Sequence, residues 1–108
     1  FVKKSVEIGK EMQVRICSFG HAGDGNLHIY VCQDGVADEQ WHETVEKVME
    51  RLYSEARLLS GEVSGEHGIG HAKRAFLEES LGCEQMELMR GIKKVFDPNG
   101  ILNPGKVI

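Results

Sequence analysis

The sequence lacks long apolar runs, and it contains few prolines and few cysteines. None of its segments approaches the run of about 18 apolar residues that a membrane-spanning helix needs. A secretory leader is also missing, because Phe1 and Val2 are followed at once by Lys3 and Lys4. We therefore expect neither a transmembrane segment nor a signal peptide within these residues.

The three cysteines form no CxxC pair, which argues against a zinc-ribbon type of site. Their odd number favours reduced thiols and a cytoplasmic setting, with membrane association through an electron-transfer partner left open. An excess of positive charge is lacking too, since 13 Lys and Arg face 17 Asp and Glu for a net charge of −4. The basic residues are scattered, so we expect no nucleic-acid partner.

The chain contains no internal repeat, low-complexity tract or long linker, so we expect a single compact unit. Its 108 residues are 41% hydrophobic, which suits one folded domain or a large part of one. Because no initiator methionine is present, we expect a fragment of a longer protein or a processed chain.

The patterns predict an α+β fold in which an antiparallel hairpin packs on helices. β-branched residues alternate in two short segments that flank the turn residues 23–26. Apolar residues recur at three- and four-residue steps in the longest helical segment, which Asp38 can cap. In chain order we expect a helix over 2–11, strands over 13–19 and 27–32, and helices over 38–60, 73–81 and 84–96.

The last helix should end at residues 97–100, because proline cannot continue a helix and Asn-Gly accepts positive φ. Its inward residues are expected to be Met86, Met89, Ile92, Val95 and Phe96. Residues 101–108 read as an extended arm that needs another part of the protein to lie against.

The hairpin predicts a pair of facing histidines. If Asp24 and Gly25 form a two-residue turn, His21 lies opposite His28 with Cβ atoms about 4.5–5.5 Å apart. Two imidazoles at that separation can bind one divalent ion. A merely polar strand surface is the alternative. The same register makes Phe19 face Tyr30 and Cys17 face Cys32, the latter as a disulfide or, as we favour, two buried thiols.

The opposite face of the hairpin should build the core under the helices. Its expected residues are Val14, Ile16, Leu27, Ile29 and Val31.

The glycine-rich segment 64–70 places a carboxylate beside an imidazole. In an extended segment Glu66 and His67 would point to opposite sides, so one could bind a metal while the other faces a substrate. Glu66 would complete a His-His-Glu set with open coordination positions, and His67 could accept a hydroxyl proton near neutral pH. A solvated flexible loop is the alternative.

Three motifs in order, His21–His28 (HAGDGNLH), Ser64–Gly70 (SGEHGIG) and Phe96–Lys106 (FDPNGILNPGK), carry a family resemblance. The sequence resembles the C-terminal domain of FAD-linked oxidases of the vanillyl-alcohol oxidase superfamily, of the glycolate oxidase flavin subunit, D-lactate dehydrogenase and D-2-hydroxyglutarate dehydrogenase type. The resemblance implies that residues 1–96 are the C-terminal part of a ferredoxin-like substrate (cap) domain. Residues 97–108 would be an arm returning to an FAD-binding domain upstream of this chain.

The resemblance also implies roles for individual residues. It implies a divalent metal, zinc or manganese, bound by three side chains: His21, His28 and Glu66. His67 matches the proposed catalytic base, Asn26 the asparagine that meets the substrate carboxylate, and Asn103 a residue in contact with the flavin.

The implied activity is FAD-dependent, metal-assisted oxidation of a small 2-hydroxy acid to a 2-oxo acid. D-lactate, glycolate or D-2-hydroxyglutarate would be the substrate, an unidentified electron acceptor the partner, and the fragment alone would be inactive. A non-catalytic metal-binding or homodimerisation module and a metal-dependent hydrolase are the alternatives. Neither accounts for an arm that ends in Asn-Pro-Gly-Lys.

Overall fold

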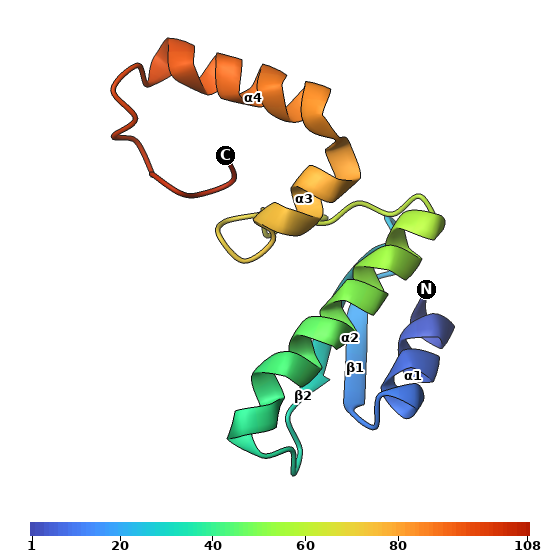
Figure 1. Cartoon of the computed structure of the whole chain (residues 1–108). Helices are drawn as coiled ribbons and strands as arrows, with labels where there is room; N and C mark the ends of the chain where they lie inside the picture. The colour runs from blue at the N-terminus through green and yellow to red at the C-terminus, as the bar shows by residue number, and fades with distance from the viewer. The chain divides into compact units, whose positions relative to one another are not determined.

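The computed structural model describes residues 1–108 and divides them into two compact units, Phe1–Gly61 and Glu62–Ile108. The first unit contains helix α1 (Val2–Glu11), strands β1 (Arg15–His21) and β2 (Asn26–Cys32), and helix α2 (Asp38–Leu58). The second contains α3 (Arg74–Leu81) and α4 (Cys83–Phe96) (Figure 1). The α+β class is confirmed. The expectation of a single compact unit is wrong, because the glycine-rich segment after α2 forms neither helix nor strand.

The first unit has its core between one face of the hairpin and two helices. Four buried side chains make up this core: Ile8 of α1, Val14, and Val48 and Leu52 of α2. Ile16, Ile29 and Val31 pack against them from the strands, as the alternation predicts. The apolar face of the hairpin therefore builds the core and leaves the other face to carry polar and aromatic side chains.

The N-cap of helix α2 lies one residue before the position expected for it. Ala37 is the N-cap, and Asp38 is the first helical residue, where its carboxylate accepts a hydrogen bond of 2.6 Å from Gln33 Nε2. A carboxylate in the first turn also favours the helix through the macrodipole. The prediction that Asp38 caps the helix is therefore wrong by one position.

A paired set of backbone hydrogen bonds ends α2. The Gly61 N–H donates to the Ala56 carbonyl at 2.8 Å, and the Ser60 N–H donates to the Arg57 carbonyl at 2.9 Å. Ser60 takes the left-handed conformation, with φ of 57°. This is the Schellman arrangement, in which the residue after the C-cap turns the chain and satisfies the last carbonyls.

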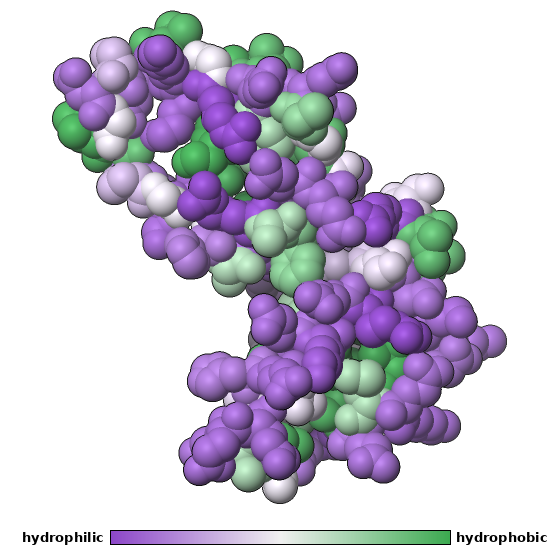
Figure 2. Space-filling view, in the orientation of Figure 1, coloured by the Kyte–Doolittle hydropathy of each residue, from purple (hydrophilic) through white to green (hydrophobic).

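The second unit buries little apolar surface. Leu77 of α3 and Met86 of α4 are its buried hydrophobic residues. The prediction that α4 buries its later apolar residues is wrong within this chain, since Ile92, Val95 and Phe96 are exposed. Figure 2 shows apolar residues at the surface among polar ones.

The segment after α4 folds back on its own unit. The Val107 N–H donates to the Gly70 carbonyl at 2.8 Å, and Arg74 Nη1 donates to the Gly105 carbonyl at 3.4 Å. Asn103 has a φ of 46°, so the segment turns instead of running as the extended arm that we expected. None of the helices combines the length and the apolar character that crossing a lipid bilayer requires.

Candidate functional site

The loop between β1 and β2 is longer than the sequence suggested. It spans residues 22–25, and the Gly25 N–H closes it by donating to the His21 carbonyl at 3.0 Å. The Asp24 side chain accepts the Asn26 N–H at 3.1 Å, and Gly25 has a φ of 73°. A four-residue loop therefore replaces the predicted two-residue turn, because Asp24 bonds the chain after the loop instead of occupying a tight turn.

This loop shifts the strand register by two residues. His21 pairs with Asn26 and Phe19 pairs with His28, so the prediction that His21 lies directly opposite His28 is wrong. A shift of two residues preserves the face to which each side chain points. His21 and His28 therefore still share one face of the hairpin, as diagonal neighbours.

The two histidines lie close enough for a shared ion. Their ring centroids are 5.9 Å apart and their planes are inclined by 77°. Two imidazoles bound to one zinc ion through bonds of about 2.0–2.1 Å have centroids roughly 5 Å apart at the tetrahedral angle. Small rotations of the side chains close the remaining difference. His21 is exposed and His28 is half-buried, so both can be reached by an ion.

Asn26 belongs to the same face. It is two residues before His28 on β2 and directly opposite His21, and alternation along the strand gives these three residues one side of the sheet. The residue that the family resemblance assigned to the substrate carboxylate thus lies beside both predicted metal ligands.

Gly20 is a site residue that sequence reasoning missed. A Cβ built on Gly20 would overlap the carbonyl oxygen of Asn26 and lie 3.0 Å from the Cα of Leu27. The two strands therefore approach each other more closely here than any side chain permits. The signal in the sequence was a glycine inside a strand pattern, immediately before a predicted ligand.

Glu66 and His67 lie in the second unit and contact each other. His67 Nε2 is 3.4 Å from Glu66 Oε1, and both side chains are exposed. The segment is bent and not extended, with Gly68 at a φ of 76°, so the prediction that the two side chains point to opposite sides is wrong. The carboxylate can orient the imidazole.

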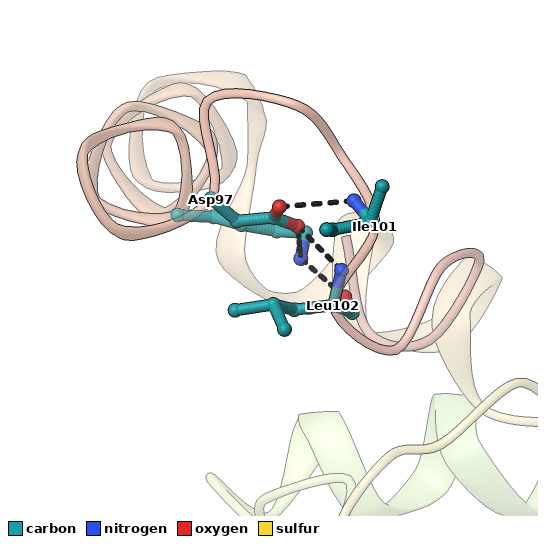
Figure 3. A network of polar contacts seen from close by, with 4 residues as sticks. Asp97, Ile101 and Leu102 are labelled. Carbon is teal, nitrogen blue, oxygen red and sulfur yellow. Dashed lines mark hydrogen bonds and ion pairs between the residues drawn. The ribbon is translucent and has the colours of Figure 1, made fainter.

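A buried carboxylate holds the loop that carries Asn103. Asp97, 6% exposed, accepts the N–H groups of Ile101 at 2.9 Å and Leu102 at 3.0 Å (Figure 3). Lys93 Nζ donates to Asp97 at 3.0 Å and to the Leu102 carbonyl at 2.8 Å. Asn103 follows directly and is exposed.

These contacts set the charge state of Asp97. Burial by itself would raise its pKa, but the Lys93 ammonium and two backbone N–H groups outweigh that effect and hold the pKa below its usual range. Sequence reasoning treated Asp97 only as part of a helix-ending motif and missed this role.

The cysteines are free thiols. Cys17 is exposed and Cys32 half-buried, so the expectation of two buried thiols is wrong. Their predicted pairing fails as well, because Cys17 pairs with Tyr30 in the observed register. Burial and the neighbouring Cys17 thiol raise the pKa of Cys32, which keeps that thiol protonated at neutral pH.

Comparison with known proteins decides the family. The family described as FAD linked oxidases, C-terminal domain, matches residues 1–107. The chain belongs to this family. The resemblance drawn from the three motifs is thereby confirmed.

Several named relatives align along most of this FAD-oxidase domain. A D-lactate dehydrogenase of Anaerostipes hadrus is 49% identical over 107 residues, which are 99% of this chain and 22% of the relative. The glycolate oxidase subunit GlcD of Bacillus subtilis is 41% identical over 106 residues, 98% of this chain and 22% of the relative. A D-2-hydroxyglutarate dehydrogenase of Stutzerimonas stutzeri is 40% identical over 90 residues, 82% of this chain and 19% of the relative. The chain thus spans about a fifth of the length of these relatives.

Proposed function

We propose that this chain is the C-terminal part of an FAD-dependent 2-hydroxy-acid dehydrogenase or oxidase, which converts the hydroxyl to a 2-oxo group. The family match over residues 1–107 carries the proposal. It is supported by relatives whose names specify D-lactate, glycolate and D-2-hydroxyglutarate enzymes. The substrate is a small 2-hydroxy acid of this class, and the electron acceptor is a separate partner.

The proposal assigns two parts of the chain to different domains of the complete enzyme. Residues 1–96 would contribute to a ferredoxin-like substrate domain, and residues 97–108 would return to the domain that holds most of the FAD. Asn103 is suited to touch the flavin, because it is exposed and its loop is fixed by Asp97. FAD, when bound, would accept the hydride from the α-carbon of the substrate.

We propose a zinc or manganese ion on His21, His28 and Glu66. The proximity of the two imidazoles on one hairpin face supports the histidine part of this site. Imidazole and carboxylate ligands suit either metal, and three protein ligands leave open positions for a substrate. The metal, when bound, would polarise the substrate hydroxyl as a Lewis acid.

Two other residues would bind the substrate and accept its proton. The Asn26 side-chain amide would donate a hydrogen bond to the substrate carboxylate from its place beside His21 and His28. His67 would accept the hydroxyl proton on a ring nitrogen, and its contact with Glu66 would orient the imidazole.

The visible absorption spectrum of the complete protein tests the reaction class. It should be recorded before and after anaerobic addition of D-lactate, glycolate and D-2-hydroxyglutarate. Bleaching of bound flavin by one of them is expected and would identify the substrate. A folded protein that contains no flavin would refute the proposal.

A variant of His67 tests the proposed base. We expect His67→Ala to slow flavin reduction at least about 100-fold, the lower end of general-base effects, while FAD and metal stay bound. His42→Ala is the matched control, because His42 is an exposed histidine of α2. Equal reduction rates in the two variants would remove His67 from this role.

A further inference from the structure

The polar face of the hairpin carries two large aromatic side chains that add nothing to the core. Phe19 is 59% exposed and Tyr30 is 56% exposed. Both belong to the first unit, on the face that also carries His21 and His28. Aromatic residues that stay this exposed on a strand need another reason for their position than burial.

Phe19 has a specific contact with one of the predicted ligands. It pairs directly with His28 across the ladder, and the two rings stack with centroids 5.1 Å apart and planes inclined by 26°. Phe19 also stacks on Tyr30, at 5.5 Å and 17°. His28 therefore has a flat contact with Phe19 and an edge contact with His21, whose ring is inclined by 77° to its own.

The geometry of a stack determines what it can do for a ligand. Stacking uses the face of the imidazole, whereas the lone pair that binds a metal lies in the ring plane at the edge. An aromatic ring on the face thus restricts the side-chain rotation of His28 without covering its nitrogen atoms. A ligand already held in its binding orientation loses less conformational freedom when the metal arrives.

We propose that Phe19 is a positioning residue for the metal site, which restricts the rotation of the His28 imidazole beside His21. The inference rests on the proposed metal site of His21, His28 and Glu66. Tyr30, two residues after His28 on β2, stacks on Phe19 and has a smaller effect on the orientation of His28. Without this restraint the metal must itself immobilise the His28 side chain, which corresponds to an affinity for metal that is about two- to tenfold weaker.

The test measures metal affinity and not turnover. The complete protein is stripped of metal and titrated with zinc against a competing chelator. Phe19→Leu keeps an apolar side chain but removes the stack that restrains His28, so we expect zinc to bind about two- to tenfold more weakly. Phe19→Tyr restores a ring and should restore the affinity. Tyr30→Leu, which removes an exposed aromatic from the same face without removing the Phe19–His28 stack, should stay within about twofold of wild type.

A second measurement stands apart from metal binding. In the metal-free protein, the ring protons of His28 should shift toward their unstacked NMR positions in Phe19→Leu and not in Phe19→Tyr. Affinity in Phe19→Leu equal to that of wild type would overturn the positioning role while the metal site stands. An equal loss of zinc affinity in Phe19→Leu and Tyr30→Leu would overturn the positioning role too. The aromatic residues of this face would then stabilise the hairpin as a whole and not orient His28 in particular. A wild-type protein that binds neither zinc nor manganese would overturn the metal site and this inference with it.

Discussion

Replacing Gly20 by alanine should damage the candidate site more than its small size suggests. The added Cβ would overlap the carbonyl oxygen of Asn26, which lies opposite His21. Relief of this overlap requires the backbone of one strand to move by on the order of 1 Å, and such overpacking costs about 1–3 kcal/mol. The movement occurs at the strand ends that carry His21 and Asn26. Because His21 lies on β1 and His28 on β2, the movement should separate these two predicted metal ligands.

The magnitude follows from the size of the first unit. For a unit of about 60 residues, each kcal/mol lowers the melting temperature by about 4–8 °C. We therefore expect Gly20→Ala to melt roughly 4–24 °C below wild type if the strain lies between about 1 and 3 kcal/mol. If half of that strain falls on the metal-bound geometry, zinc affinity should drop about two- to tenfold.

Gly23→Ala is the matched control for this experiment. A Cβ on Gly23 meets nothing within 4 Å, and its φ is not in the left-handed region. This substitution should leave the melting temperature unchanged or raise it slightly, since alanine reduces the freedom of the unfolded chain. Thermal melting and zinc titration of the three proteins decide the matter. If Gly20→Ala behaved like Gly23→Ala in both assays, the argument from strand approach would be refuted.

Two further predictions concern the core and the last loop. Leu52→Ala, in the core of the first unit, should cost about 2–5 kcal/mol by calorimetry, whereas Leu58→Ala at an exposed position of the same helix should change stability by less than about 0.5 kcal/mol. The pKa of Asp97 is lower in the folded state than its ordinary value of 3.8, so its contribution to stability is present above that value and is lost as pH falls through the folded pKa. The protection of the Leu102 amide against hydrogen exchange should therefore fall as the pH drops through the folded pKa of Asp97. In Asp97→Asn this pH-dependent loss of protection should vanish, and an identical pH profile in both proteins would contradict the role of the carboxylate.

The sequence predicted the elements well, because their signals are local. The hairpin alternation and the three- and four-residue apolar steps placed both strands and all four helices within a few residues of their observed bounds. The exposed apolar side chains Ile92, Val95 and Phe96 were assigned to the interior, because periodicity identifies an apolar face but not what covers it. The division near Gly61 was missed because the glycine-rich segment there was interpreted as a candidate site and not as a boundary.

The hairpin register shows that only an odd error in the predicted strand pairing would move a site residue to the other face of the sheet. The turn was assigned two residues too short, yet the two histidines kept their common face because the error was even. An error of one residue would have moved one histidine into the core. What the pattern could not give was the stack of Phe19 on His28, since that contact exists only in the observed register.

Each of the three motifs is stabilised by local contacts between residues that are close in the sequence or across the hairpin. Gly20 lets the strands close beside Asn26, Glu66 contacts His67, and Asp97 binds the loop before Asn103. Such short-range contacts need only a few residues of the right kind at the right spacing. Assembly of the proposed metal site would depend instead on packing between segments far apart in the chain. Metal affinity in Glu66→Gln is therefore the most direct measure of that assembly. A loss like that of His28→Ala would mean that Glu66 joins the histidines at the ion, and an unchanged affinity would leave the hairpin pair to bind it without this carboxylate.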